Sequence, residues 1–153
     1  TNIGPMYAMG GFNDIKRQVD QSVAMGARVV AGGKGEGAFY EPTILTDLTL
    51  EMPVMNEETF GPVAAVYRVA DEAEAIKVSN STDFGLGGSV WTQDLEKGKR
   101  IAVEMDEGGV FINGMVKSDP RLPFGGVKNS GYGRELSRHG IMEFVNVKTV
   151  WVR

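Results

Sequence analysis

Residues 88–113 decide the fold, and they read GSVWTQDLEKGKRIAVEMDEGGVFIN. Residues 88–92 predict a strand, and residues 94–105 predict a helix that is stopped by a pair of glycines. A second apolar run, residues 110–113, predicts another core strand. A strand, a helix and a strand in this order predict a crossover unit, in which the two strands run parallel.

The same alternation extends toward the N-terminus. Residues 62–69 are rich in valine and alanine and start beside a Gly-Pro pair, which predicts a buried strand. Residues 71–80 predict a helix, because Asp71 can cap it and Glu74 completes a capping-box pattern. We therefore expect an α/β fold with a largely parallel sheet flanked by helices.

Further elements lie on both sides of this region. Ile15, Val19 and Val23 recur every four residues and predict a helix over residues 13–25. Asn13 is a candidate N-cap and Gly26 a candidate C′ residue. The other expected elements are a strand (28–31), a turn (32–37), an extended segment (40–45), an irregular glycine-rich segment (123–133), a helix (134–144) and a final extended run (145–152). Pro42 indicates that the segment over residues 40–45 either lies at a sheet edge or is irregular.

Composition limits the kinds of partner. The 153 residues carry a formal net charge of −4, and the densest basic group is Lys97, Lys99 and Arg100. Because Glu96 and Glu104 flank this group, a solvated helix face is the better interpretation than a phosphate-binding patch, and no nucleic-acid partner is expected. No apolar run approaches the roughly 20 residues of a membrane span, so we expect no membrane partner and a cytoplasmic location.

The titratable and redox-active residues exclude several kinds of site. The chain has no cysteine, which excludes disulfides, thiolate metal sites and thiol nucleophiles within it. His139 is the only histidine. It has no second ligand nearby, so a surface position is the better interpretation than a metal ligand or a general base, and no metal is expected.

Two glycine-rich stretches invite comparison with phosphate-binding loops. The first, residues 33–37, misses the GxGxxG spacing and precedes an extended segment rather than a helix, so it predicts a turn between strands. The second, residues 124–133, lacks the spacing of a Walker loop. It predicts a loop that bends sharply or approaches another group closely, and that group could be ligand or protein.

Four motifs in order carry a family resemblance. They are EETFGPV at residues 57–63, NSTDFGL at 80–86, GVFIN at 109–113, and PFGG at 123–126 followed by Lys128, Ser130-Gly131 and Gly133-Arg134-Glu135. The chain resembles the C-terminal part of the aldehyde dehydrogenase catalytic domain along its whole length. Within the family, residues 110–114, 118–119, 124–128 and 133–137 look most like the NAD(P)-dependent succinate-semialdehyde dehydrogenase branch.

The resemblance implies how the chain is organised. Residues 1–144 would form the C-terminal part of the catalytic domain, and residues 145–153 a tail strand at an assembly interface of a homo-oligomer. The substrate would be a small-molecule aldehyde, and the cofactor NAD or NADP. The nucleophilic cysteine and the glutamate base would both lie upstream of this chain, so the chain by itself is predicted to be inactive.

The resemblance also assigns roles to four residues. The Glu58 carboxylate would accept hydrogen bonds from both ribose hydroxyls beside the nicotinamide, and Phe60 would pack near that ring. Without the motif, these two are a surface acid and a core aromatic, and Glu57 looks solvent-facing. Phe124 would line the aldehyde tunnel, or else pack in the core. Ser118 would bind the substrate carboxylate, or else be an ordinary loop serine.

A carboxylate needs a cation as well as a hydroxyl donor. Arg121 is a local candidate without support from the family, whose carboxylate-binding arginines are expected upstream. Two other functions stay open: an aldehyde dehydrogenase with a different substrate, and a non-catalytic module that uses this fold to bind a partner.

Overall fold

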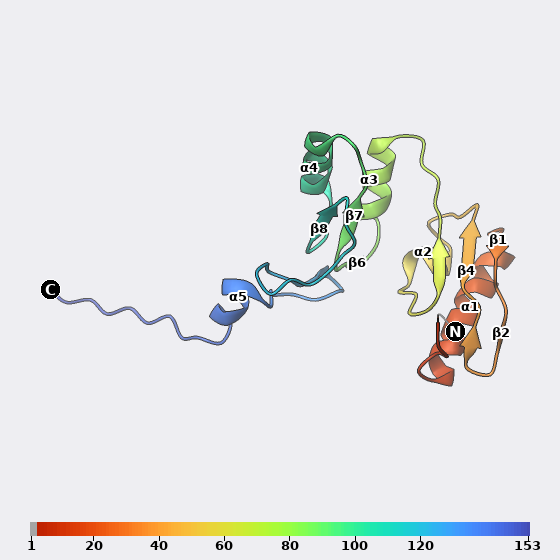
Figure 1. Ribbon diagram of the computed structural model, residues 1–153, viewed down its shortest axis with the longest axis horizontal. Coiled ribbons are helices and arrows are strands. Elements are labelled where there is room, and N and C mark those ends of the chain that lie inside the picture. The colour runs from red at the N-terminus through yellow and green to blue at the C-terminus, as the bar shows by residue number, and fades with distance from the viewer. Residues whose placement is uncertain (1–2) are drawn as a thin grey trace. The chain divides into compact units, whose positions relative to one another are not determined.

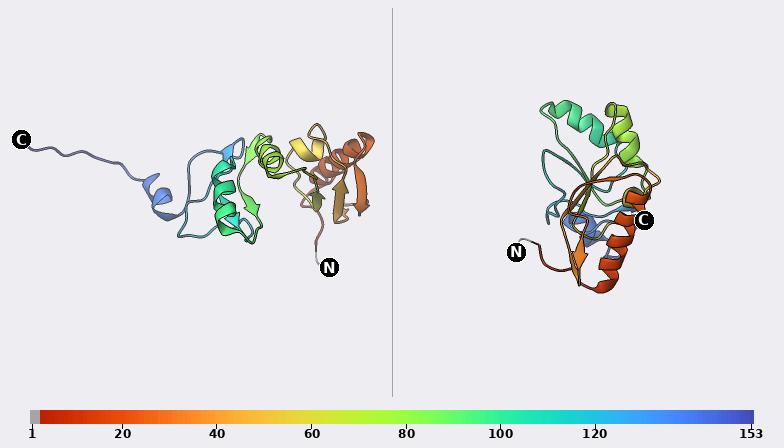
Figure 2. Two further views of the ribbon diagram at one scale, coloured as in Figure 1. Left: turned by 90° about the horizontal axis from the view of Figure 1, so that it is seen from above. Right: turned by 90° about the vertical axis from the view of Figure 1, so that its right-hand side faces the viewer.

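The computed structural model describes residues 3–153, which fall into two compact units (Figure 1). The division follows Ala75, inside helix α3 (Glu72–Asn80). The first unit is drawn in red to yellow, and the second in green to blue (Figure 2). Each unit contains helices and strands of its own, which confirms the expected α/β class.

The first unit is a sheet covered by a long helix. Strands β1 (Arg28–Ala31), β4 (Thr43–Thr46) and β5 (Val63–Ala65) form a sheet in the order β1-β4-β5. β4 pairs with β1 in antiparallel fashion and with β5 in parallel fashion. Short strands β2 (Gly35–Glu36) and β3 (Phe39–Tyr40) form a separate antiparallel hairpin that turns at residues 37–38. The turn predicted over residues 33–37 is therefore wrong at residues 35 and 36, which form β2. The remaining elements are helices α1 (Met9–Ala24) and α2 (Pro53–Asn56).

The core of this unit lies between α1, the central strand β4 and the segment around α2. Ile15 and Val19 on α1 are 1% exposed, and Leu45 on β4 is fully buried. Met52, just before α2, completes this cluster with other apolar residues. Ile15 and Val19 of the predicted α1 stripe therefore pack as expected, whereas Val23, its third member, is 40% exposed.

Helix α1 begins earlier than its sequence suggests. It starts at Met9, so Asn13 lies inside the helix, and the prediction of Asn13 as N-cap is wrong. The N-cap is Ala8, which makes no side-chain capping bond. Phe12 is 8% exposed in the core, so packing of the first turn replaces the missing cap. At the other end, Gly26 has φ +113, the left-handed conformation expected of a C′ glycine.

Helix α3 begins with the predicted capping box. The backbone N–H of Glu74 donates to Asp71 Oδ1 at 2.9 Å, and the Glu74 carboxylate accepts from the Ala70 N–H at 2.6 Å. The first bond satisfies one N-terminal donor that the helix leaves free, and the second reaches one residue before Asp71 rather than the Asp71 N–H of a standard capping box.

The second unit contains the predicted crossover. Strands β7 (Gly88–Val90) and β8 (Val110–Ile112) run parallel, with helix α4 (Leu95–Glu104) between them in the chain. Asp94 caps α4 by accepting a hydrogen bond from the Lys97 N–H at 3.0 Å. Strand β6 (Phe84–Gly85) pairs in antiparallel fashion with β9 (Val127–Lys128) in the glycine-rich segment. Helix α5 (Ser137–Met142) follows.

Three predicted elements are shorter than expected. The strand predicted over residues 62–69 is reduced to β5, which lies at the edge of its sheet with Ala64 and Ala65 exposed rather than buried. The helix predicted over residues 134–144 is reduced to α5, because Leu136, the residue before α5, and Ser137, its first residue, have positive φ values and so prevent the helix from starting earlier. The final run, residues 145–152, has no strand partner among the described residues.

No helix within residues 3–153 is long and apolar enough to cross a membrane.

Candidate functional site

The first candidate site is the loop that joins α2 to β5. Glu58 and Phe60 both lie on this loop, and the Phe60 side chain is 73% exposed. No group among residues 3–153 bonds the Glu58 carboxylate. The loop turns tightly, because the Gly61 N–H donates to the Thr59 carbonyl at 3.0 Å. A free carboxylate and an exposed aromatic ring, two residues apart, can contact a ligand that carries hydroxyl groups and a flat ring.

Two side chains of α1 hold this loop. Arg17 donates to both carboxylate oxygens of Glu57, at 2.6 and 3.2 Å. Gln18 Nε2 donates to Glu57 Oε2 at 3.1 Å and to the backbone carbonyl of Glu58 at 3.0 Å. The hydrogen bonds from Arg17, and then that from Gln18, hold the pKa of the Glu57 carboxyl below its ordinary value.

Glu57 and Glu58 therefore differ in role although they are neighbours. Glu57, which we expected to face solvent, is half-buried and anchors the loop to α1. Its oxygens are occupied, whereas those of Glu58 are available to a ligand. Sequence reasoning missed Arg17 and Gln18, which lie 40 residues before the loop. One local signal was present: Gln18 is a polar residue on the buried face of α1, three residues after Ile15.

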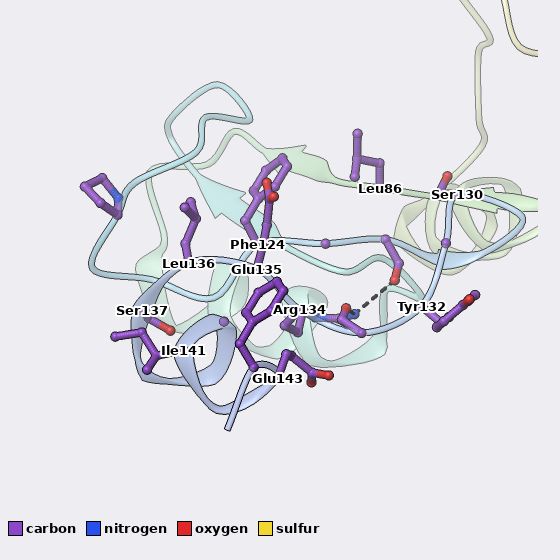
Figure 3. A pocket seen from close by; sticks show the side chains of 17 residues that line it. Leu86, Phe124, Ser130, Tyr132, Arg134, Glu135, Leu136, Ser137, Ile141 and Glu143 are labelled. Carbon is purple, nitrogen blue, oxygen red and sulfur yellow. Dashed lines mark hydrogen bonds between the residues drawn. The ribbon is translucent and has the colours of Figure 1, made fainter. Parts of the chain in front are cut away.

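The second candidate site is a hollow in the second unit. It has a volume of about 920 Å³, and its lining is mainly apolar (Figure 3). Phe124 lines it and is held by two backbone hydrogen bonds to Glu135, of 2.9 and 2.8 Å. The two side chains lie next to each other, and helix α5, which carries Ile141, borders the same hollow (Figure 3). Phe124 is half-buried, so its ring is neither free in solvent nor part of a closed core.

The glycines near Phe124 permit close contact between backbone segments. A Cβ atom on Gly108 would lie 1.7 Å from the Gly125 carbonyl oxygen, and one on Gly125 would lie 2.7 Å from the Gly133 carbonyl oxygen. A Cβ atom on Gly126 would lie 2.6 Å from Ser130 Cβ. The close approach predicted for this loop is therefore made to protein.

Ser118 lies apart from the hollow. It is exposed, in the segment after β8, and it is not among the residues that line the hollow. Arg121, the local candidate for a carboxylate-binding cation, instead binds Asp119 through Nε at 2.9 Å and through a terminal nitrogen at 2.7 Å. This hydrogen bonding lowers the pKa of the Asp119 carboxyl. Arg121 is thus already paired, and its proposed role as a free cation for the substrate is not supported.

The four predicted site residues fall in different units. Glu58 and Phe60 belong to the first, and Ser118 and Phe124 to the second. His139 is exposed. Within residues 3–153, no three His, Cys, Asp or Glu side chains come together as a possible metal site.

Comparison with known proteins gives a consistent result. A family model described as the aldehyde dehydrogenase family matches residues 1–150. An NADP(+) succinate-semialdehyde dehydrogenase of Mycobacterium ulcerans is 52% identical to the chain, over 99% of this chain and 34% of the relative. One from Mycobacterium avium is 51% identical, over 99% and 33%. A solved succinic semialdehyde dehydrogenase from Streptococcus pyogenes, in complex with NADP+, has a TM-score of 0.92 and 40% identity, over 97% of this chain and 33% of that one. The chain spans about a third of the length of the curated relatives it matches.

Proposed function

The chain belongs to the aldehyde dehydrogenase family, and on that premise we propose that it is the C-terminal part of an enzyme that oxidises succinate semialdehyde to succinate with NAD or NADP. The observation that carries this proposal is the Glu58 carboxylate, which is free on a loop that α1 holds in place. The Mycobacterium ulcerans relative, a succinate-semialdehyde dehydrogenase by name, supports the choice of substrate.

Glu58 and Phe60 have the chemistry needed for the nicotinamide end of the cofactor. The two oxygens of a carboxylate can accept hydrogen bonds from both hydroxyls of one ribose. The exposed ring of Phe60 offers a flat apolar surface beside it. Bound NAD or NADP supplies the hydride acceptor, and the task of Glu58 is to fix the position of the ribose relative to the aldehyde.

Ser118 and Phe124 are the proposed contacts of the substrate. The Ser118 hydroxyl would donate to the substrate carboxylate, and Phe124 would line the path of the aliphatic chain. Arg121 neutralises the neighbouring Asp119, which lowers the repulsion that a substrate carboxylate would meet there. The positive charge that binds the substrate must then come from arginines elsewhere in the complete protein.

The covalent chemistry requires residues that this chain lacks. A cysteine thiolate would add to the aldehyde carbon, and water would later hydrolyse the thioester with help from a glutamate base. The chain has no cysteine, so the nucleophile lies elsewhere in the complete protein, and we infer that the chain alone is inactive. We also propose that residues 1–144 complete the catalytic domain, and that residues 145–153 lie at an interface of a cytoplasmic homo-oligomer.

The decisive experiment measures hydride transfer in the full-length protein. Glu58→Gln keeps the shape of the side chain and removes its charge. Because a hydrogen bond to a charged group contributes about 1.5–3 kcal/mol, we expect single-turnover NAD(P)H formation to slow by about 10- to 100-fold. Glu36→Gln, at an exposed glutamate of β2, is the control and should leave the rate unchanged. Unchanged single-turnover kinetics in Glu58→Gln would contradict the assigned role.

A second experiment tests the substrate. Ser118→Ala should reduce the preference for succinate semialdehyde over butyraldehyde by about tenfold, because butyraldehyde has no carboxylate to accept the bond. Ser89→Ala, at an exposed serine of β7, is the control. If Ser118→Ala keeps the preference for succinate semialdehyde, Ser118 does not bind the substrate carboxylate. If the full-length protein oxidises no aldehyde at all, a binding module becomes the better interpretation.

A further inference from the structure

Gln18 is a buried amide on helix α1. Its side chain is 3% exposed, on the face of α1 that also carries Ile15 and Val19. Its two hydrogen-bond partners, the Glu57 carboxylate and the Glu58 carbonyl, are both acceptors, so the amide nitrogen must face them. The amide oxygen then points elsewhere and is buried without a partner among the described residues.

This arrangement is unfavourable for packing alone. A buried oxygen without a partner destabilises the fold, whereas an apolar side chain of the same length would fill the space without that cost. What the amide provides instead is a pair of donors that reach across to the loop. The role of the Gln18 amide therefore lies in holding the loop rather than in packing the core.

The two bonds of Gln18 hold the loop at Glu57 and at Glu58. One binds the side chain of the preceding residue at 3.1 Å, and the other binds the carbonyl of Glu58 itself at 3.0 Å. The Glu57 N–H, bonded to the Pro53 carbonyl at 2.9 Å, secures the start of the loop. The peptide group that follows the Glu58 Cα atom is thereby restrained through its carbonyl, and the preceding residue is held through its side chain and its N–H. Together these bonds limit the direction in which the Glu58 side chain leaves the backbone.

Arg17 cannot replace Gln18 in this function. The Arg17 and Glu57 side chains are 43% and 38% exposed, so water and salt weaken their ion pair. Arg17 donates to the side chains of Glu57 and Gln21, and it makes no bond to Glu58. The bond from Gln18 to the Glu58 carbonyl is neutral, largely shielded, and independent of salt.

We propose that Gln18 is a positioning residue for Glu58: its carboxamide holds the loop backbone so that the Glu58 carboxylate points at the nicotinamide ribose. The proposal rests on the proposed function of Glu58, and it adds a residue 40 positions away on a different element. Gln18 touches neither cofactor nor substrate, and it acts only through the Glu58 backbone.

The test is a double-mutant cycle in the full-length protein. Gln18→Met keeps the length and burial of the side chain and removes both donors. The variants Gln18→Met, Glu58→Gln and the combination of the two are compared with the unaltered protein. KM for the cofactor, the single-turnover rate and the melting temperature are measured for each. Gln93→Met makes the same chemical change at an exposed turn residue and serves as the matched control.

We expect Gln18→Met to raise the cofactor KM and to slow the single turnover, so that the ratio of rate to KM falls by about five- to tenfold. This factor corresponds to the net contribution of about one hydrogen bond. In the Glu58→Gln background, the same change should have almost no further effect, because its target is gone. A purely structural role would lower the melting temperature equally in both backgrounds and would make the kinetic losses multiply.

The possible outcomes distinguish the positioning role of Gln18 from the proposed role of Glu58. Wild-type cofactor kinetics in Gln18→Met, or losses that multiply in the double variant, would overturn the positioning role while leaving the role of Glu58 intact. A silent Glu58→Gln would overturn the proposed function itself. If Gln18→Met does not fold, Gln18→Asn, which keeps the amide but shortens its reach by one methylene, is judged by the same outcomes.

Discussion

Gly108→Ala is the substitution whose effect the structure specifies most closely. Gly108 has ordinary φ, so the added methyl group causes no conformational strain of its own. The methyl carbon would, however, lie 1.7 Å from the Gly125 carbonyl oxygen and 2.8 Å from its carbonyl carbon. Both contacts are with backbone, which cannot turn aside as a side chain can.

The size of the effect follows from that distance. A carbon and a carbonyl oxygen approach no closer than roughly 3.3 Å, so the two backbone segments must separate by about 1.6 Å. Overpacking of this kind costs about 1–3 kcal/mol, and a clash of backbone on backbone belongs at the upper end. The smaller entropy of the unfolded chain offsets about 0.4–1 kcal/mol, which leaves a net loss of about 2 kcal/mol.

The shift also reaches Phe124, the residue before Gly125. Phe124 is bonded to Glu135 on both sides of its backbone, so a displaced Gly125 must strain this pairing or move Phe124 with it. A misplacement of about 1 Å in a substrate-contacting group can lower kcat/KM by about 100-fold. We expect a loss of that order for aldehyde oxidation by the full-length protein, with a lower denaturation midpoint.

Gly109→Ala is the matched control. It is the same change one residue along, and its methyl group would meet only Phe111 Cε2 at 3.4 Å, an ordinary contact. It should keep kcat/KM near that of the unaltered protein. If Gly108→Ala also keeps both its denaturation midpoint and its kcat/KM, the close packing of Gly108 on Gly125 does not exist as described. If the two variants are equally damaged, the glycine pair matters for some other reason.

Two further predictions concern the first unit. Leu45→Ala should lower the free energy of unfolding by about 2–5 kcal/mol in chemical denaturation, because Leu45 is fully buried on the central strand. The control Leu95→Ala, at a 56% exposed position, should lower it much less. A loss below about 1 kcal/mol for Leu45→Ala would contradict the described core. The bonds from Arg17 and Gln18 lower the pKa of Glu57 from its ordinary value of 4.5. Their contribution to the free energy of unfolding is therefore complete above pH 4.5, and it is lost as the pH falls through the lowered pKa of the folded protein. The difference in melting temperature between the unaltered protein and Glu57→Gln should therefore narrow below pH 4.5, and a difference that stays constant down to acid unfolding would count against the ion pair.

Elements with local signals were predictable from the sequence. The capping box of α3 needs only Asp71 and Glu74, which are three residues apart, and the β7-α4-β8 unit is evident from apolar runs and the glycines that separate them. Helix α1 begins four residues before the start that its sequence predicts, because burial of Phe12 outweighs the low helix propensity of Gly10 and Gly11. Propensity is local, whereas burial depends on the rest of the fold.

The same distinction applies to the candidate sites. The resemblance to a family pointed to Glu58, but nothing near it in the sequence distinguishes it from Glu57. The difference comes from Arg17 and Gln18, which the fold brings from 40 residues away to occupy one carboxylate and leave the other available. Gly108 and Gly109 are likewise equivalent in sequence, and only the position of Gly125 separates a forbidden methyl group from a tolerated one.

Exposure of the proposed contact residues points to what the rest of the protein must supply. Hydride transfer to a cofactor needs a site from which water is excluded. Phe60 is 73% exposed and Glu58 is exposed as well, so in this chain neither is shielded. Phe144 and Trp151, near the C-terminal end, are 92% and 81% exposed, and exposed apolar surface of this kind is typical of faces that other protein segments cover. If Glu58, Phe60 and Phe124 have the roles proposed for them, further protein segments must enclose them, and the curated relatives, of which the chain spans about a third, are long enough to contain such segments.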